Sequence, residues 1–372
     1  MSLLSPARTM MPGALYRRNP RTLIRLFITS TAPTVACNSH IIKSCRPLSG
    51  LCLPRSSLYG FSYSTHSAMA APLTVPEPIV HDVFEPRTGT LQYVVADPAT
   101  KSCVIIDPVL DFDDTSRNID TDSADALLAL VRKHGYHVER ILETHAHADH
   151  ITAASYLQSR LAQEQNHKPP IGIGKRITQV QKLFGERYSV VPAEYKTVFD
   201  ILFGDNETFS IGALTATVMH LPGHTPDHLG YKIGDNVFCG DSLFNADIGT
   251  ARCDFPGGNA DDLFRSGKTL LSLPEHTKIW TGHDYPPQDR GAPEPWMTVH
   301  GHREQNKHLR DGVSRDEFVA LRRERDAKLG EPRLLHQSLQ INIRGGRFPQ
   351  PTASGHRMLL MPFKFKPKDL QW

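Results

Sequence analysis

The sequence predicts a layered protein of mixed α/β structure. A strand, a helix, a second strand, a polar loop and a second helix follow one another between Cys103 and Leu157, the order expected when helices cover a sheet. Residues 214–219 alternate apolar and polar side chains, which is typical of a strand with one buried face. Histidine and aspartate side chains follow several of the apolar strands. Loops at strand ends commonly carry functional groups on a rigid scaffold.

The globular pattern begins near Ile79. Residues 91–95 predict a strand, and residues 103–108 predict a second, more buried strand after a short turn, so we expect a hairpin or meander. Asp107 closes this apolar run, where a carboxylate is costly unless it has a partner. Two roles are open for Asp107: orientation of ligands from behind, or capping of the following loop.

Residues 123–135 have the features of a helix. Leu127, Leu130 and Val131 recur at helical spacing, basic residues occupy the last turn, and a glycine ends the segment. The acidic stretch 111–122 before it is expected to be a loop. After it, residues 138–142 predict a strand that leads into a histidine cluster, and a helix is expected to start at Ile151.

The middle of the chain is less regular until residue 214. We expect a short strand at 171–174, a helix at 177–184, the alternating strand 214–219, and a hairpin over 228–240 with its turn at 234–236.

The C-terminal third mixes helices with late strands. Residues 302–329 are rich in charge and are expected to be helical. Residues 339–343 alternate like a strand, and residues 358–365 are expected to form another. We find no internal repeat and no second long domain.

The charge of the chain is unevenly distributed. Overall the formal charge is +3, but residues 1–76 hold eight basic residues and no acidic ones, so residues 77–372 carry a net charge of −5. An arginine-rich, acid-free N-terminus is typical of an organelle transit peptide. We therefore predict that residues 1–70 are a disordered mitochondrial transit peptide, cleaved between about 55 and 75, and that residues 77–372 form a catalytic domain with a C-terminal extension in the mitochondrial matrix.

The composition also limits the partners. No apolar run approaches the ~20 residues that span a bilayer, so we expect a soluble protein with no membrane contact. The acidic balance of residues 77–372 gives no basis for nucleic-acid binding. Cys103, Cys239 and Cys253 remain after the leader, without paired spacing, which argues against disulfides and against a cysteine zinc site.

Four segments supply candidate metal ligands. The first holds three histidines and one aspartate within six residues, and three later segments each add one candidate after an apolar strand. Histidine and aspartate are ligands for zinc and iron. The candidates are His145, His147, Asp149, His150, His224, Asp241 and His283.

These motifs resemble those of the metallo-β-lactamase superfamily over roughly residues 79–345. The resemblance rests on His145-x-His147-x-Asp149-His150, Gly223-His224-Thr225-Pro226, Gly240-Asp241 and Gly282-His283-Asp284. It implies an α+β fold, a four-layer αββα sandwich in which two sheets lie face to face, helices lie outside and the metal lies at one edge.

Within the superfamily, the chain is most similar to the persulfide dioxygenases, also called sulfur dioxygenases, which are related to glyoxalase II. The matching stretches are 143–150, 221–226, 240–244, 249–258, 282–285 and 306–308. Such enzymes use one Fe(II) to oxidise glutathione persulfide with O2 to sulfite and glutathione, so the resemblance implies this cofactor, these partners and a place in mitochondrial sulfide oxidation. The assembly is left open, with a homodimer as one option.

The resemblance also implies roles for the candidate residues. His145, His224 and Asp241 would hold the single iron and be the catalytic residues, in the facial arrangement of two histidines and one carboxylate. The other four, His147, Asp149, His150 and His283, would orient these ligands or line the pocket. The spacing alone does not separate this from a second metal bound by the same residues.

Arg252 and Tyr285 are the expected contacts to glutathione. A guanidinium grips a carboxylate with two hydrogen bonds, although a structural ion pair is the alternative for Arg252. Tyr285 could hydrogen-bond the tripeptide or simply fill the pocket wall. Some family members place an arginine where His308 stands, so Arg303 or Lys307 is considered as a substitute.

Two cysteines and several rival functions stay open. Cys253, beside Arg252, has either a redox or persulfide-carrying role or the role of a small buried hydrophobe; Cys239 is expected in the core. The main rival is a glutathione thioesterase of the glyoxalase II type, with two zinc ions or mixed metals and an attacking bridging hydroxide. Another zinc hydrolase of this fold and a non-catalytic metal or glutathione sensor are the remaining alternatives.

Overall fold

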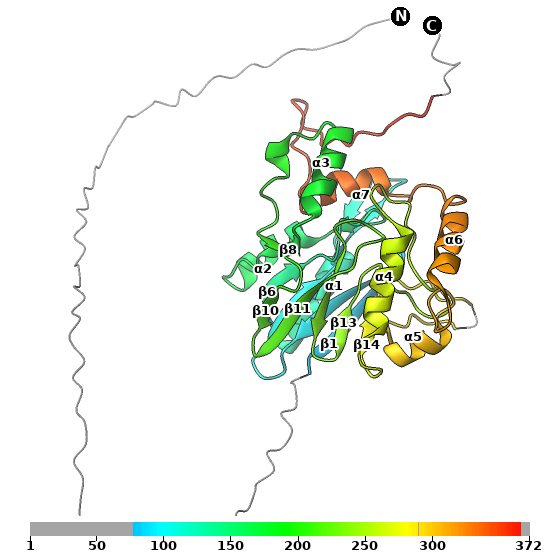
Figure 1. Cartoon of the computed structure of the whole chain (residues 1–372). Helices are drawn as coiled ribbons and strands as arrows, with labels where there is room; N and C mark the ends of the chain where they lie inside the picture. The colour runs from blue at the N-terminus through cyan, green and yellow to red at the C-terminus, as the bar shows by residue number, and fades with distance from the viewer. Residues whose placement is uncertain (1–76, 289, 366–372) are drawn as a thin grey trace, which may run out of the picture. The chain divides into compact units, whose positions relative to one another are not determined.

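Two six-stranded β-sheets form the centre of the molecule (Figure 1). The computed structural model describes residues 77–288 and 290–365, all within one compact unit. The first sheet has the order β1-β2-β3-β6-β8-β9. Its strands are β1 (Ile79–Glu85), β2 (Thr90–Ala96), β3 (Ser102–Ile106), β6 (His137–Leu142), β8 (Ile171–Gly174) and β9 (Ile201–Phe203). The pairs β3/β6, β6/β8 and β8/β9 are parallel.

The second sheet follows chain order from β10 to β15. Its strands are β10 (Thr208–Ile211), β11 (Leu214–His220), β12 (Leu229–Ile233), β13 (Asn236–Phe238), β14 (Lys278–Trp280) and β15 (Trp296–Thr298). Only the β13/β14 pair is parallel among these described strands. A small third sheet joins β5 (Asn118–Asp120), β4 (Val109–Asp113) and β7 (Ile151–Thr152).

The two large sheets pack face to face through a shared apolar core. Tyr93 and Val95 of β2 face this core together with Trp280 of β14. Val94, which lies between them in sequence, faces the opposite side, as the period-two geometry of a strand requires. The alternation in the sequence therefore corresponds to two separate apolar layers.

Helices cover the outer faces of both sheets, so the molecule has four layers. On the first sheet lie α1 (Asp122–His134) and α2 (Ala154–Glu164), and on the second lie α4 (Ala260–Leu271), α5 (Val299–Gln305) and α6 (Arg315–Asp326). Gly135 ends α1 in a left-handed conformation with φ 64°, as its place after the last helical turn predicts. This arrangement confirms the predicted αββα sandwich.

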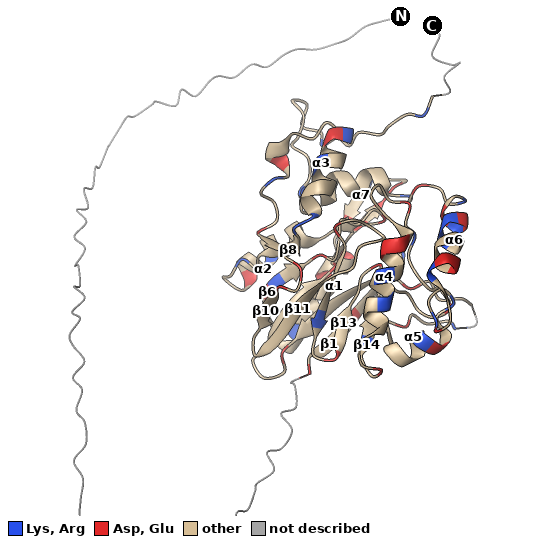
Figure 2. Ribbon diagram, in the orientation of Figure 1, with Lys and Arg blue, Asp and Glu red and all other residues tan. Residues whose placement is uncertain are grey.

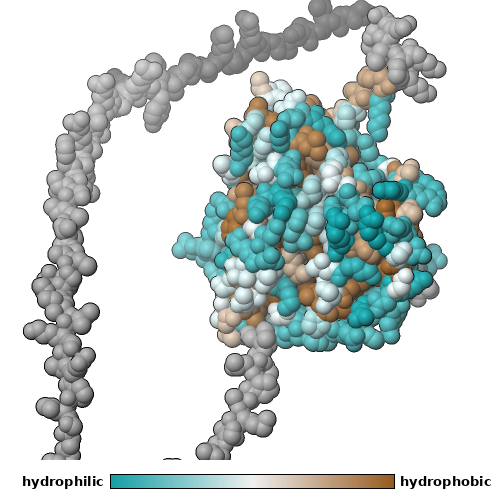
Figure 3. All heavy atoms as spheres, in the orientation of Figure 1, coloured by the Kyte–Doolittle hydropathy of each residue, from teal (hydrophilic) through white to brown (hydrophobic). Residues whose placement is uncertain are grey.

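A third helical cluster packs beside the histidine loop. It contains α3 (Ile177–Arg187) and α7 (Leu335–Asn342), which contact Ala146 and Ala148 between the histidines. A short 3-10 helix, η1 (Pro192–Glu194), follows α3. No described helix has both the length and the apolarity to cross a membrane. Hydrophilic residues cover much of the face shown in Figure 3.

Three local predictions are wrong. Residues 339–342 belong to α7, and Ile343 caps its C-terminus. Leu339 packs into one apolar cluster and Ile341 into another, so the apolar spacing imitates that of a strand. Residues 358–365 form no strand; the backbone of Leu360 is instead held by the side chain of Gln340. The stretch 111–122 includes β5 and part of β4, because β4 pairs with both β5 and β7.

The other predicted strands and helices between residues 91 and 240 are present. The stretch 302–329, predicted to be helical, is helical only in part, because residues 306–314 between α5 (Val299–Gln305) and α6 (Arg315–Asp326) form no helix. The expected helix start at Ile151 is displaced to Ala154 by the two residues of β7. The predicted transit peptide, residues 1–70, lies outside the described residues.

Candidate metal centre

Three candidate ligands meet where strands of both sheets end. His145 follows β6 of the first sheet, and His224 and Asp241 follow β11 and β13 of the second sheet. One ligand atom from each of the three lies within 4.8 Å of the other two. The structure thus brings together the trio proposed from the sequence, at an edge that the two sheets share.

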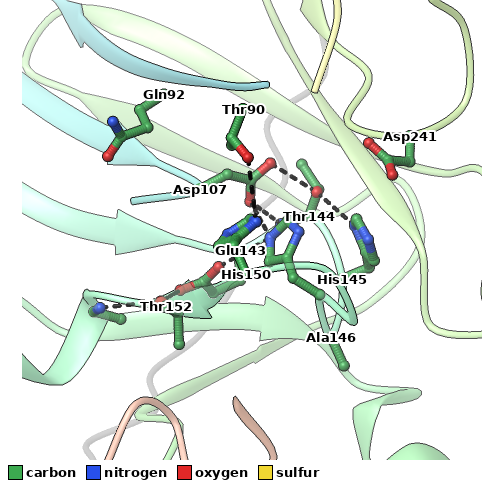
Figure 4. Close-up of polar contacts among 12 residues, drawn as sticks. Thr90, Gln92, Asp107, Glu143, Thr144, His145, Ala146, His150, Thr152 and Asp241 are labelled. Atoms are coloured by element: carbon green, nitrogen blue, oxygen red, sulfur yellow. Dashed lines mark hydrogen bonds and ion pairs between the residues drawn. The ribbon is translucent and has the colours of Figure 1, made fainter. Parts of the chain in front are cut away.

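Hydrogen bonds fix the tautomer of both imidazoles. Thr144 Oγ1 donates to Asp107 Oδ2 at 2.8 Å, so it accepts from Nδ1–H of His145 at 3.0 Å (Figure 4). His224 Nδ1 lies 2.8 Å from the carbonyl oxygen of Arg252, which can only accept. In both rings the proton therefore lies on Nδ1, and Nε2 presents the lone pair that a metal needs.

The unpaired atoms of the trio fit a metal ion. His145 Nε2 and Asp241 Oδ1 are buried without a hydrogen-bond partner among the described residues. Such atoms are costly to bury unless something binds them. Asp241 Oδ2 lies 3.5 Å from His224 Nε2. Two neutral imidazoles and a carboxylate form a donor set suited to zinc or iron.

Burial keeps the ligand ring of His145 neutral. Desolvation, reinforced by the neighbouring histidines, lowers its pKa well below the ordinary value. A neutral imidazole at physiological pH is ready to bind a metal without first losing a proton.

His228 supports the trio through contacts with Asp241 and His145. Its Nε2 accepts a hydrogen bond from the backbone N–H of Asp241 at 2.9 Å, and its ring stacks on that of His145 with 4.7 Å between centroids. Gly240, before Asp241, has φ 47°, and a Cβ there would lie 2.5 Å from Thr144 Oγ1. The chain therefore needs glycine at this turn to bring Asp241 over the histidine loop.

His147 is held by two buried carboxylates. Its Nε2 lies 3.1 Å from Asp107 Oδ1 and 3.3 Å from Glu143 Oε2. Burial opposes a charge on the ring, but the two carboxylates outweigh it and raise the pKa of His147 well above its ordinary value. Asp107 also accepts from the backbone N–H of Thr144 at 2.7 Å. It thus performs both roles left open, orienting histidines and fixing the loop.

The other three candidates form a second group around Asp149. Asp149 Oδ2 lies 3.2 Å from His150 Nδ1 and 3.2 Å from His283 Nε2. His283 Nε2 also lies 3.5 Å from Asp241 Oδ1. Asp241 therefore directs one carboxylate oxygen toward His224 and the other toward His283. All seven predicted positions lie in one continuous cluster, with enough donors for a second metal.

Asn342 of α7 anchors the histidine loop. Its side-chain amide donates to the carbonyl oxygens of His147 and His150, at 2.8 Å each, and its Oδ1 accepts from Thr152 N–H at 2.9 Å. The loop is irregular, and these bonds satisfy backbone groups that no strand partner reaches.

The trio opens into a cavity of about 440 Å³ lined by both predicted substrate contacts. The guanidinium of Arg252 is engaged by Asp254, with Nε and Nη2 each 2.5 Å from a carboxylate oxygen. Arg252 thus forms the ion pair that was its alternative role, while its carbonyl holds His224. Tyr285 stacks on His283 with 5.8 Å between ring centroids and is 53% exposed.

The substitutes proposed for the missing arginine do not reach this cavity. Arg303 pairs with Asp311, and Lys307 donates to the carbonyl of Asp247; neither side chain lines the cavity. His308 is buried and lies 2.8 Å from Nη1 of Arg325, which does line it.

Both described cysteines near the site are buried. Burial raises the pKa of the Cys253 thiol to about 12, and that of Cys239 to about 12. Thiols with such pKa values are poor nucleophiles, which favours the structural role for Cys253.

Several supporting residues were not identified from the sequence. His228 stands four residues after His224, so its place beside a ligand was a usable signal. Glu143 immediately precedes the histidine motif. Asn342 and Arg325 carry no local signal, because they reach the site only through the packing of α7 and α6.

The fold and this cluster define a metal-binding protein of the αββα type. A model of the metallo-beta-lactamase superfamily matches residues 86–283, and the chain belongs to this superfamily. It is 45% identical over 289 residues to a beta-lactamase hydrolase-like protein of Xylella fastidiosa, covering 77% of this chain and 65% of that protein. The chain thus spans about two thirds of that relative's length.

Other relatives bear on the choice of reaction. The chain is 42% identical over 289 residues to Glyoxylase B2 of Dictyostelium discoideum, covering 76% of this chain and 97% of that protein. It is 28% identical over 229 residues to the mitochondrial persulfide dioxygenase ETHE1 of Bos taurus, covering 61% and 74%. The crystal structure of ETHE1 from Myxococcus xanthus superposes with a TM-score of 0.57 at 27% identity, covering 72% of this chain and all of that one.

Proposed function

We propose that the protein is a mononuclear iron dioxygenase that oxidises glutathione persulfide with O2 to sulfite and glutathione. The trio of His145, His224 and Asp241 carries the proposal, because two neutral histidines and one carboxylate suit an iron with open positions for O2 and substrate. Nε2 of His147 faces Asp107 and Glu143, whereas its Nδ1 has no hydrogen-bond partner among the described residues and stays free as a donor for a second metal. The similarity to ETHE1 from cattle and from Myxococcus xanthus supports the dioxygenase.

The residues of the chain supply geometry and protonation states. Bound Fe(II) would supply the oxygen chemistry. Thr144 and the carbonyl of Arg252 hold the protons of the two ligand histidines on Nδ1. Phe244 and Ile248 provide an apolar part of the cavity wall, which limits water near the reacting sulfur. In the overall reaction, four electrons pass from the outer persulfide sulfur to O2, water supplies the third oxygen of sulfite, and glutathione leaves as the thiol.

The proposal places the enzyme in the mitochondrial matrix. Residues 1–76 have the arginine-rich, acid-free composition of a transit peptide, and the bovine relative is named as mitochondrial. A reporter fused after residues 1–76 should be imported into mitochondria and shortened. A reporter that stays in the cytosol at full length would contradict this location.

A dinuclear hydrolase of the glyoxalase type is the second candidate. It is favoured by Asp241, whose two oxygens face His224 and His283, as a carboxylate shared by two metals would. The similarity to the relative named Glyoxylase B2 extends over 97% of that protein's length. In that case a metal-activated water would attack a glutathione thioester.

Metal content and O2 uptake, measured together on protein purified without oxygen, separate the two candidates. The dioxygenase should hold about one iron per chain and consume O2 only when glutathione persulfide is added. Two metals per chain, no O2 uptake and rapid cleavage of S-lactoylglutathione would refute the dioxygenase and establish the hydrolase. An iron-loaded Asp241→Ala protein with full activity would refute both.

A further inference from the structure

A second cavity lies apart from the metal centre, between the β4–β5 hairpin, α7 and residues 348–365, here called the C-terminal segment. Its volume is about 840 Å³, against about 440 Å³ at the metal centre, and among the described residues none lines both cavities. Cavities of about 300–1,000 Å³ with mostly apolar walls and a few polar groups are the usual sites of small molecules. The size of this cavity therefore suits a ligand of its own.

Most of the cavity wall is apolar. Met358 and Met361 of the C-terminal segment are 60% and 50% exposed, so much of their apolar surface is not covered by the described chain. Uncovered apolar surface beside polar groups is typical of a ligand-binding groove. The apolar residues of the wall include Phe112, Ile119, Ile341, Phe348, Met358 and Met361.

The C-terminal segment is fixed against α7, so this wall is formed before any ligand arrives. Gln340 holds the backbone of Leu360 on both sides: its Nε2 lies 2.9 Å from the carbonyl oxygen, and its Oε1 accepts from the N–H at 2.9 Å. Leu359 packs against the same apolar cluster as Ile341. A preformed wall spares a ligand the cost of ordering the segment.

The charged groups of the cavity favour an anion. The C-terminal segment carries Arg357 and Lys364 and no acidic residue (Figure 2). Arg357 donates from Nη1 to the carbonyl oxygen of Pro349, a neutral acceptor that fixes the guanidinium and leaves its charge in place. Asp114 is the acidic residue of the wall, and it is already paired with Arg333 at 3.1 Å. In the part of the chain that the structure describes, no carboxylate pairs with Arg357.

Gln337 of α7 adds a buried polar atom to the same wall. Its Oε1 is buried without a hydrogen-bond partner among the described residues. Such an atom is costly to bury unless something binds it. A half-turn of the side-chain amide brings its NH2 group to the same point, so Gln337 can donate there to a carboxylate.

We propose that this cavity binds a free long-chain fatty carboxylate. The alkyl chain lies along the apolar wall, Arg357 binds the carboxylate, and the amide of Gln337 offers a further hydrogen bond. The site uses no residue of the metal centre and does not depend on the proposed reaction. Its occupant contacts α7, the helix whose Asn342 holds the carbonyl oxygens of the histidine loop.

Displacement of a fluorescent fatty acid, dansylaminoundecanoic acid, from the full chain tests the site. Palmitate should displace this probe from the wild type. Met358→Glu and Met361→Glu put a carboxylate into the wall, and each should raise the dissociation constant of palmitate at least about tenfold. Leu360→Glu is the matched control, because Leu360 lies between the two methionines, is 52% exposed and does not line the cavity.

The carboxylate contact is tested by comparing dodecanoate with dodecanol. Arg357→Ala should weaken dodecanoate binding about tenfold and leave dodecanol binding nearly unchanged, because only the acid carries a charge. Arg347→Ala is the control, since Arg347 is exposed just before the C-terminal segment and does not line the cavity. Equal losses for the acid and the alcohol would contradict the role of Arg357.

Gln337→Met separates a binding role from a structural one. It removes the buried oxygen at similar volume, so the ligand-free protein should be no less stable to urea, whereas dodecanoate should bind more weakly. A loss of stability with unchanged dodecanoate affinity would show that Gln337 only supports the fold.

The outcomes separate this inference from the proposed function. Palmitate binding that depends on Met358 and Met361, without O2 uptake, would support the fatty-acid site and count against the dioxygenase. Persulfide-dependent O2 uptake without palmitate binding would do the reverse. Equal palmitate affinity in Met358→Glu, Met361→Glu and Leu360→Glu would overturn the inference. Capture of the protein by phosphatidylglycerol vesicles without binding of free palmitate would overturn it too, in favour of a lipid surface.

Discussion

The imidazole of His228 accepts a hydrogen bond from the backbone N–H of Asp241 at 2.9 Å, so a second histidine fixes the place of this candidate carboxylate ligand. His228 is fully buried, and desolvation lowers its pKa well below the ordinary value, which keeps it neutral and able to accept. The ligand carboxylate is therefore positioned through its main chain as well as its side chain.

His228→Leu should weaken metal binding. Without the acceptor, the turn at Asp241 loses a buried hydrogen bond, and loss of such supporting contacts typically lowers metal affinity by about 10- to 100-fold. Competition with a chelator would measure the change. His220→Leu is the control, because His220 is half-buried at the end of β11 and its Nε2 faces the carbonyl oxygen of Pro226 instead of Asp241. Equal affinities in the two variants would contradict the role of His228.

Asn342→Asp should loosen the histidine loop. The change keeps the shape of the side chain, but it removes both donors to the carbonyl oxygens of His147 and His150. We expect a loss of about 1–3 kcal/mol in the free energy of unfolding, together with weaker metal binding. Chemical denaturation and metal titration would measure both.

The same substitution at Gln340 provides the control for Asn342. Gln340 lies on the same helix as Asn342. Gln340→Glu removes the donor to the carbonyl oxygen of Leu360, which is far in sequence from the histidine loop. It should cost stability without changing metal affinity. Equal metal affinities in the two variants would show that the loop does not depend on Asn342.

The sequence predicts the sandwich because its signals are local. Tyr93 and Val95 face one layer and Val94 the other, and such alternation is visible within a few residues. It fails at Leu339 and Ile341, because α7 packs against two apolar clusters and its helical spacing is hidden by apolar residues on both faces.

The residues of the site likewise divide into those with a local sequence signal and those without one. His145, His224 and Asp241 follow strand ends, so their meeting could be predicted from motifs and topology. Asn342 lies 195 residues from His147, and no sequence pattern connects them. Arg325 likewise reaches the cavity only because α6 packs on the second sheet. The meeting of the candidate ligands is therefore predictable, whereas the residues that position them depend on tertiary packing.

His302 should make stability sensitive to acid. It is 2% exposed on α5, and burial lowers its pKa to about 4, against about 6.5 in an unfolded chain. The unfolded state therefore binds more protons between these values, so this contribution to stability is present above about pH 6.5 and is lost as the pH falls toward 4. The slope should reach about 1.4 kcal/mol per pH unit.

Urea denaturation between about pH 7 and pH 4.5 would test this dependence. His302→Leu should show a flatter decline in the free energy of unfolding than the wild type. His300→Leu, an exposed position on the same helix, should keep the wild-type slope. Identical slopes in all three proteins would mean that His302 is not the group that titrates.

Removal of a bound metal should lower the thermal stability, and this effect should depend on Asp241. Without an ion, His145 Nε2 and Asp241 Oδ1 are buried with no hydrogen-bond partner among the described residues. A ligand present at about 100 times its dissociation constant stabilises the folded state by about 2.7 kcal/mol. For a domain of this size that corresponds to a fall in Tm of about 5–10 °C on chelation. Asp241→Asn weakens the site and should make Tm insensitive to the chelator. Asp235→Asn, at an exposed position next to β13, should keep the full fall in Tm on chelation. A wild-type Tm that does not change on complete metal removal would contradict the fit of the trio to an ion.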